Sequence, residues 1–316
     1  MRNLLRLILV FPIVAACSRD RGAGPGPDVP VDLWSRLEDM AAPLRMYDGG
    51  DQDGCIGDSS QIYLAGAAPN EGAILYTFDP VALTFHKVGL LTGCPASVWS
   101  KGGFYPTAMA LDRTTAWMNF WDGGQQVLRE RLYKIDLDKA TCTDTGADLT
   151  DAHLSFLVSG LASLPDKKNP AKDVLYSTVQ YQDGVGMVTA LATIDTTALK
   201  VTEVAATPAA AKLSDTGDGH LFAYMGGALV EMDPATAAVK SSKQLKLPIQ
   251  SWPGMTLVFW QKQVWMFVAA DSPLNATTHA YLIDPATGSA TEKATLKDFY
   301  VAGSAVQPCV AIMPPG

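Results

Sequence analysis

The stretch Tyr281-Leu282-Ile283-Asp284-Pro285, an apolar run that ends in aspartate and a turn, recurs four more times along the chain. The other copies are Leu75-Tyr76-Thr77-Phe78-Asp79-Pro80, Leu132-Tyr133-Lys134-Ile135-Asp136, Leu191-Ala192-Thr193-Ile194-Asp195 and Leu229-Val230-Glu231-Met232-Asp233-Pro234. Aspartate caps a turn with its side chain, and a following proline presets φ. The five aspartates are therefore predicted to be structural, and the phrase predicts one small antiparallel sheet repeated five times.

The segments around each phrase recur in one order: an inner strand, a second strand, the phrase and a polar outer strand such as Lys200–Ala205 or Ser289–Thr295. The predicted second strands are Gln61–Gly66, Ala116–Trp121, Val174–Gln180, His220–Met225 and Gln263–Ala269. The predicted inner strands are Tyr105–Leu111, Ser155–Leu164, Ala209–Leu213, Gly254–Trp260 and Gly303–Met313. Four-stranded units of this kind are typical of propeller blades.

The first phrase lacks an inner strand of its own, whereas Gly303–Met313 is a spare strand after the last phrase. If the C-terminal strand completes the first blade, the ring closes and leaves no open edge between first and last blades. The sequence therefore predicts an all-β fold, a five-bladed β-propeller over residues 46–316 closed by the C-terminal strand.

The phrases resemble the broad class of bacterial propeller repeats with a Leu-Tyr-x-Ile-Asp-x-x-Thr-Gly strand and turn. This resemblance covers nearly all of residues 50–316 and implies the fold, while a fold of this kind hosts many functions. Quinoprotein dehydrogenase propellers continue the phrase into Gly-Lys and a docking tryptophan. The best turn here, Thr287-Gly288-Ser289-Ala290-Thr291, has neither, which argues against quinone binding.

The N-terminus has the layout of a secretory signal over residues 1–16, with Arg2 and Arg6 and an apolar run too short to span a bilayer. Val14-Ala15-Ala16-Cys17 resembles the lipobox of bacterial lipoproteins. The resemblance implies a mature chain that begins at Cys17, is held by acyl chains such as palmitate, and is sorted by Ser18 to the outer membrane of a Gram-negative cell. An ordinary cleaved signal is the alternative.

Residues 17–45 are predicted to hold a Gly/Pro-rich tether and a short helix over 31–43. The apolar stripe Leu33, Trp34, Leu37 and Met40 has helical spacing and is expected to pack on the propeller rather than bind a partner.

The chain is acidic, with 24 basic and 32 acidic residues and a formal charge of −8. Removal of the signal would take away two of the basic residues, Arg2 and Arg6. Such a charge repels nucleic acid and anionic lipid, so the lipid anchor is the expected contact with the membrane and nucleic acid is excluded as a partner.

Cys55, Cys94, Cys142 and Cys309 remain once Cys17 is lipidated, an even number for an oxidising compartment. Of three possible connectivities, the predicted ring favours Cys55–Cys309 and Cys94–Cys142. Four free thiols are the alternative, and no pair has zinc-site spacing.

The sequence contains no catalytic motif that indicates a reaction. His86, His153, His220 and His279 lie far apart without metal-site spacing, and the predicted inner strands carry no Asp or Glu for glycosidase chemistry. Asp148 and Asp151 only precede one such strand.

The acidic run with Asp48, Asp51, Asp53 and, beyond it, Asp58 alternates carboxylates with glycine, as calcium loops do. The EF-hand spacing is not met, so a solvated entry loop is the preferred interpretation and no cofactor is predicted. Calcium at these four residues is kept as the alternative.

Four long loops are predicted on the face where blade-to-blade crossovers run: Ala67–Gly72, Asp122–Arg131, Tyr181–Thr189 and Asp271–Thr278. Trp99, Trp121, Tyr181 and Trp252 fall in or beside them and are the candidate ligand-binding residues. The alternative is that these rings only pack between blades. The run Arg129-Glu130-Arg131 is expected to be a solvated hairpin tip, with a polar part of the same face as the alternative.

These observations favour an anchored, non-enzymatic propeller that binds a protein or a glycan in an envelope assembly. A purely scaffolding ring is a blander variant. The alternative is a propeller enzyme, either a hydrolase or lyase or a lactonase-like, calcium-dependent one.

Overall fold

The computed structural model describes residues 56–69, 71–94, 104–122, 129–149, 160–167, 169, 172–183, 186–217, 219–248, 254–270 and 275–308. All of them belong to the unit Asp32–Gly316. The predicted signal, lipidated Cys17, tether and helix lie outside the described residues.

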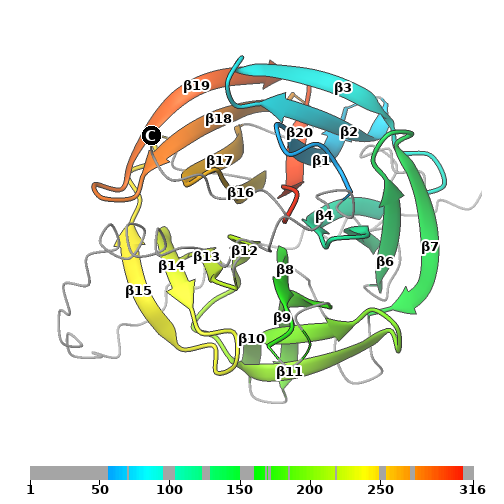
Figure 1. Cartoon of the computed structure of the whole chain (residues 1–316), viewed down its shortest axis with the longest axis vertical. Coiled ribbons are helices and arrows are strands. Elements are labelled where there is room, and N and C mark those ends of the chain that lie inside the picture. The colour runs from blue at the N-terminus through cyan, green and yellow to red at the C-terminus, as the bar shows by residue number, and fades with distance from the viewer. Residues whose placement is uncertain are drawn as a thin grey trace, which may run out of the picture. The chain divides into compact units, whose positions relative to one another are not determined.

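The described strands form five four-stranded antiparallel sheets arranged in a ring, so the five-bladed β-propeller is confirmed (Figure 1).

We number the blades in chain order and give their strands from the inside out. Blade 1 consists of β20 (Tyr300–Ala305), β1 (Ile62–Ala68), β2 (Gly72–Asp79) and β3 (Thr84–Leu90). Blade 2 consists of β4 (Phe104–Leu111), β5 (Ala116–Asp122), β6 (Arg129–Asp136) and β7 (Thr141–Asp148). Blade 3 consists of β8 (Gly160–Pro165), β9 (Asp173–Asp183), β10 (Gly186–Asp195) and β11 (Lys200–Ala206). Blade 4 consists of β12 (Lys212–Asp215), β13 (Leu221–Met225), β14 (Ala228–Met232) and β15 (Val239–Gln244). Blade 5 consists of β16 (Gly254–Trp260), β17 (Gln263–Ala270), β18 (Thr277–Asp284) and β19 (Ser289–Lys297).

The C-terminal strand closes the ring, as the sequence predicts. β20 pairs with β1 from Tyr63↔Ala305 to Ala67↔Tyr300, so the first blade takes its inner strand from the end of the chain. Next to this junction, the Gln307 side chain donates to the carbonyl oxygen of Gly57 at 3.2 Å. The predicted strand is Gly303–Met313, whereas β20 runs from Tyr300 to Ala305. It begins earlier than predicted because Tyr300 still pairs with Ala67 of β1.

The five aspartates of the repeated phrase share one turn geometry. In four turns the Oδ1 atom accepts the N–H groups two and three residues later, as Asp79 does from Val81 and Ala82, both at 2.8 Å. In the fifth, Asp284 accepts from the Ala286 N–H at 2.9 Å and the Thr287 hydroxyl at 2.6 Å. These donors lower the pKa of all five carboxyl groups. The aspartates therefore hold the backbone of the turns.

The fourth residue after each aspartate adopts a left-handed conformation. These residues are Leu83, Ala140, Leu199, Ala237 and Gly288, with φ between 51° and 70°. Beyond each turn, the pairing of the third strand with the outer strand shifts register once, in all five blades. One turn and one β-bulge are thus repeated around the ring, and the bulge increases the twist of each outer strand.

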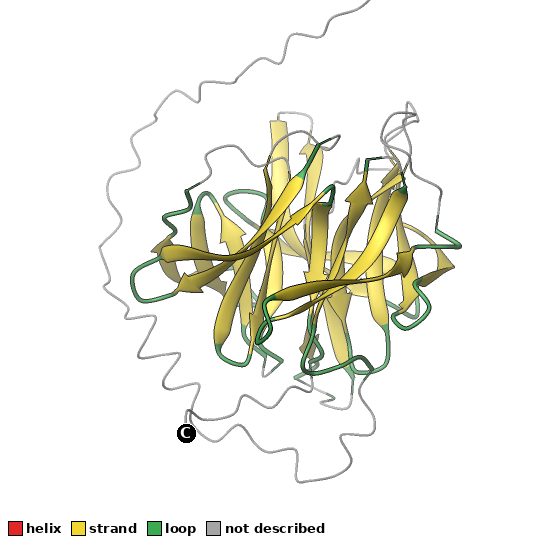
Figure 2. Cartoon of the chain, turned by 90° about the horizontal axis from the view of Figure 1, so that it is seen from above, coloured by secondary structure: helices red, strands yellow, loops and turns green. Residues whose placement is uncertain are grey.

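The hydrophobic core is divided among the five interfaces between neighbouring blades. Each of the five buried clusters joins residues of two adjacent blades. For example, Phe78 of β2 packs edge-on against Trp265 and Phe267 of β17, with ring centroids 5.2 Å and 5.4 Å apart. Seen from the side, the strands run from one face of the ring to the other, and the loops that join them lie at these two faces, which we call its ends (Figure 2). Burial between blades makes a rigid scaffold, on which loops at either end are free to carry function.

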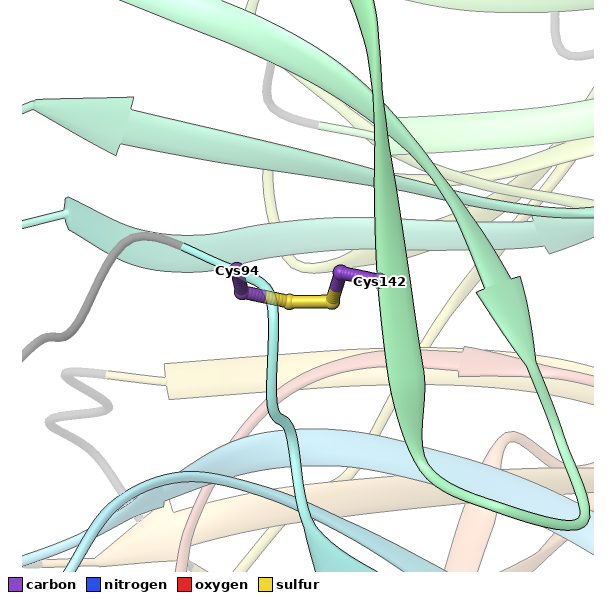
Figure 3. The surroundings of a disulfide bond; sticks show 2 residues. All are labelled: Cys94 and Cys142. Atoms are coloured by element: carbon purple, nitrogen blue, oxygen red, sulfur yellow. A yellow bond between two sulfur atoms is a disulfide. The ribbon is translucent and has the colours of Figure 1, made fainter.

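A disulfide joins Cys94, after β3 of blade 1, to Cys142 of β7 in blade 2, with Cα atoms 5.0 Å apart (Figure 3). It reinforces a short parallel bridge between Thr92 and Thr141. The pairing is the one that the sequence favours. The other predicted pair, Cys55 and Cys309, lies outside the described residues.

Candidate functional site

Polar and aromatic side chains meet where blade 2 faces blade 3, at one end of the ring. We call this end, where each outer strand leads into the next inner strand, the crossover end. The interface itself, built from the cluster that includes Trp117, Leu132, Val179 and Ala190, we call the 2–3 interface. Three features of this region define the candidate site.

The first feature is a buried polar network on blade 2. The Asn119 side-chain amide of β5 donates to the Thr107 hydroxyl at 2.8 Å and to Glu130 Oε2 at 3.1 Å. Asn119 and Glu130 are both 0% exposed. The Asn119 Oδ1 atom is buried and accepts no hydrogen bond from the described residues. A buried carbonyl oxygen without a donor costs free energy, so the network is incomplete as it stands.

The second feature is a lysine that reaches across the inside of the ring. Lys212 begins the inner strand of blade 4, and its Nζ donates to the carbonyl oxygen of Thr107 in blade 2 at 3.0 Å. The inner strand β8 of blade 3 lies between these two strands in the ring (Figure 1). No carboxylate of the described part of the chain lies within ion-pair distance of this ammonium.

Gly160 of β8 allows this close approach of the inner strands. A Cβ atom at Gly160 would collide with the backbone nitrogen of Leu213 and come within 2.8 Å of the Ala211 carbonyl oxygen. The start of β12 therefore lies against β8 only because residue 160 has no side chain.

Burial controls the charge of Lys212. Desolvation lowers the pKa of its ammonium to about 8, and the negative charge of Glu130 opposes that shift. Since an ordinary lysine titrates near 10.4, a larger fraction of Lys212 is the neutral amine at physiological pH. Neutral amines near pH 7 act as nucleophiles or proton acceptors.

The third feature is a pair of aromatic side chains at the crossover end. Trp121 pairs with Glu130 in the β5–β6 ladder, and strand alternation places its ring on the same face as Trp117, toward blade 3. Tyr181 of β9 packs on the 2–3 interface from the other side, and its hydroxyl donates to Glu203 at 2.7 Å. Both residues remain partly exposed.

The structure thus brings two of the predicted ligand-binding residues, Trp121 and Tyr181, to the same interface. Trp99 and Trp252 lie outside the described residues. Tyr181 packs on this interface and keeps part of its surface exposed, so both interpretations that the sequence left open, ligand binding and packing between blades, stay predictions.

Two expectations about the loops are wrong. Tyr181–Thr189 is not a long loop, because β9 and β10 pair as far as Asp183↔Gly186. Ala67–Gly72 is also mostly strand, since Ala68 pairs with Gly72. In both hairpins the backbone hydrogen bonds continue to the turn.

Two expectations about carboxylates are also wrong. Glu130 is not part of a solvated hairpin tip, because it faces blade 3 and the network with Asn119 buries it. The inner strands do carry a carboxylate: β12 extends past the predicted end at Leu213 to Asp215, since Asp215 still pairs with Leu221. The Asp215 carboxylate accepts the Ser163 and Gly217 N–H groups, both at 3.1 Å, and so joins blades 3 and 4.

Lys212 and Asn119 are not among the residues that the sequence pattern predicts for the site. A signal for Lys212 exists, because it is the one charged residue in the predicted inner strand Ala209–Leu213. No comparable signal marks Asn119, whose role depends on its neighbours in space.

The metal candidates find little support in the described contacts. Asp58 caps a local turn by accepting the Ser60 N–H and hydroxyl, both at 2.8 Å, while Asp48, Asp51 and Asp53 lie outside the described residues. Calcium there stays a prediction. Within the described ranges no three potential ligands gather around one point. His220 and His279 instead contact Glu231 and Glu292, at 3.2 Å and 3.1 Å.

The described part of the chain contains no helix that is long and apolar enough to cross a membrane.

No protein-family model and no curated protein matches the chain. Solved structures with a similar arrangement include TolB from Acinetobacter baumannii, with 16% identity and a TM-score of 0.40 over 76% of this chain and 54% of that one. A putative TolB from Agrobacterium tumefaciens shows 13% identity and a TM-score of 0.40 over 78% and 84%. A family 117 glycoside hydrolase from Zobellia galactanivorans shows 11% identity and a TM-score of 0.42 over 68% and 74%. The chain thus spans about half of the Acinetobacter protein, and at these levels of similarity the propeller assignment rests on the strand pairing described above.

Proposed function

We propose that this protein is an outer-membrane lipoprotein whose propeller binds an envelope protein or a glycan, without catalysis, at the crossover end of the 2–3 interface. The observation that carries the proposal is the placement of Trp121 and Tyr181, two partly exposed rings near the ends of β5 and β9 on the two sides of this interface.

Rings held on strands make good anchors because they bury a large area and lose little conformational freedom on binding. The hydrogen bond between the buried Asn119 and Glu130 joins β5 to β6 next to Trp121 and so helps to hold its strand in place. The cell-envelope location is supported by the lipobox-like tetrad that ends at Cys17 and by the Cys94–Cys142 disulfide, which suits an oxidising compartment.

Binding is tested with the full-length protein in detergent micelles. The wild type is screened on an array of bacterial envelope glycans and, separately, crosslinked in intact cells to identify protein partners. Trp121→Ala is expected to weaken the ligand found by at least about tenfold, because aromatic anchors carry 2 kcal/mol or more at an interface (about 30-fold). Tyr76→Ala is the matched control, since this partly buried ring packs between blades 1 and 5, on Phe299. Equal binding by the wild type and Trp121→Ala would place the ligand elsewhere and contradict the proposal.

The anchor is tested by feeding cells an alkyne analogue of palmitate and following its incorporation. The wild type is expected to be labelled and Cys17→Ala unlabelled, while Ser18→Asp should shift the labelled protein from the outer to the inner membrane fraction. Label that persists in Cys17→Ala would show that Cys17 is not the lipidated residue.

A further inference from the structure

We propose that Lys212 is a site of covalent carbonyl capture, where its side-chain amine condenses with a small aldehyde that enters from the crossover end of the ring. This activity goes beyond the binding function proposed above, and neither depends on the other.

The starting point is the environment of the lysine. A buried ammonium is normally paired with a carboxylate, because removing a charge from water is costly. Lys212 has instead one hydrogen bond, to the Thr107 carbonyl oxygen, and no ion pair with any described residue. An amine that is buried but unpaired is the arrangement that favours the neutral, nucleophilic form.

The amine has one hydrogen-bond acceptor among the described residues. The Thr107 carbonyl oxygen lies 3.0 Å from Nζ, and the same residue's hydroxyl holds the Asn119 amide at 2.8 Å. Glu130, bound to that amide, is the one charged residue whose field acts on the amine. This one acceptor leaves two of the three N–H groups of an ammonium without a partner, whereas an iminium ion keeps a single N–H that the Thr107 carbonyl oxygen can accept.

Asn119 supplies an independent observation. Asn119 is 0% exposed, and its Oδ1 atom accepts no hydrogen bond from the described residues. A carbonyl compound that adds to the amine passes through a carbinolamine, whose hydroxyl is a donor. The unsatisfied oxygen in the same network is a partner of the right kind for that hydroxyl.

Part of Lys212 is open to the crossover end, although its amine is buried. Lys212 begins β12, so it lies at the crossover end of the inner strand, and the residue keeps part of its surface exposed. Gly160, across from it, contributes no side chain that could cover the lysine stem.

The reaction balances without a redox partner. The amine nitrogen forms a bond with the carbonyl carbon, and the carbonyl oxygen leaves as water with both amine protons. A proton from solvent then converts the imine to the iminium ion, whose single N–H the Thr107 carbonyl oxygen can accept.

The test measures the reactivity of each lysine in the wild-type full-length protein. The protein in detergent micelles is treated with propionaldehyde and sodium cyanoborohydride at pH 6 to 9, and the alkylation rate of each lysine is read from peptide mass spectra. Lys212 is expected to react at least about tenfold faster at pH 7 than the exposed Lys200 and Lys293, because more of it is neutral. A Lys212 rate equal to or below theirs, or labelling that occurs only after unfolding, would overturn the proposal.

A second variant tests the role of the network. In Glu130→Gln the charge that opposes deprotonation is lost, so the midpoint of the pH–rate profile at Lys212 should move to lower pH, while the profiles of Lys200 and Lys293 stay unchanged. An unchanged midpoint in a variant with wild-type circular dichroism would show that Glu130 does not act on this amine. Because the wild-type rates stand by themselves, the proposal remains testable even if Glu130→Gln fails to fold.

Discussion

At the scale of the residue, Lys212 shows how burial changes chemistry without any change of side chain. Its ammonium is transferred into the ring, hydrogen-bonded to a backbone carbonyl oxygen, and left without an ion pair among the described residues. The protein therefore carries a destabilising charge at neutral pH, a cost that natural proteins tolerate mainly where the group has a use.

This cost predicts an unusual dependence of stability on pH. Burial lowers the pKa of Lys212 to about 8 in the folded protein, whereas the unfolded chain titrates near 10.4. Between these values the unfolded state binds more protons, so the contribution of Lys212 to the free energy of unfolding rises with pH from about 8 upward. The free energy of unfolding of the wild type relative to Lys212→Met should increase between pH 7 and pH 9.5, as measured by urea titration.

The ionisation of buried tyrosines sets the upper limit of the pH range over which this rise in the free energy of unfolding can be measured. Burial raises the pKa of Tyr224, Tyr281 and Tyr300 to about 12, so their contributions are lost only as the pH rises above about 10. Lys200→Met, at an exposed position, is the control and should show no such trend. Parallel pH profiles for the wild type and Lys212→Met would contradict the assigned pKa shift.

At the scale of the element, the Asp-capped turn is the unit that the chain repeats. The left-handed position four residues after the aspartate is filled by glycine only in blade 5. A side chain in this conformation costs roughly 1–2 kcal/mol, so four of the five turns carry strain that packing or the cap offsets.

The strain can be tested by placing a glycine at one of these left-handed positions and by removing the glycine from another. Leu83 is 38% exposed, so Leu83→Gly loses little packing and should raise the free energy of unfolding by about 1 kcal/mol. Gly288→Ala should lower it by about 1–3 kcal/mol, since φ is 70° and the new Cβ would collide with the Gln244 carbonyl oxygen. Thermal and urea unfolding measure both. A destabilised Leu83→Gly would mean that the leucine side chain contributes more than the backbone strain costs.

At the scale of the whole molecule, ring closure depends on inner strands that approach very closely. Gly303 of β20 faces β4, where a Cβ atom would come within 2.6 Å of the Met109 nitrogen. The first and second blades therefore meet at a point that has no room for a methyl group.

Gly303→Ala is expected to destabilise the protein by at least about 2 kcal/mol, because two inner strands would have to separate. Gly186→Ala is the matched control: it lies in the β9–β10 hairpin, has open space around its Cβ position, and should change the free energy of unfolding by less than about 0.5 kcal/mol. Equal effects of the two substitutions would show that the ring relaxes easily at β20.

The disulfide acts on the same scale, since it joins blades 1 and 2 and closes a loop with a sequence separation of 48. The double variant Cys94→Ala/Cys142→Ala should lose about 3–4 kcal/mol in the free energy of unfolding, mostly through a less constrained unfolded chain. The effect should vanish when wild type and variant are compared under reducing conditions. A remaining difference would indicate that the two side chains contribute through packing.

The number of blades, the turn after each phrase and the closing strand could be predicted from the sequence, and the predicted ring favours the Cys94–Cys142 pairing. These depend on local chemistry, namely alternating apolar residues, aspartate caps and a spare strand without a partner, and they repeat often enough to be recognised. The burial of Glu130, the position of Tyr181 in a hairpin and the contact of Lys212 with Thr107 across blade 3 became visible only in the three-dimensional arrangement. Those outcomes depend on which blades are neighbours and on how closely inner strands pack at Gly160, distances that no run of adjacent residues encodes.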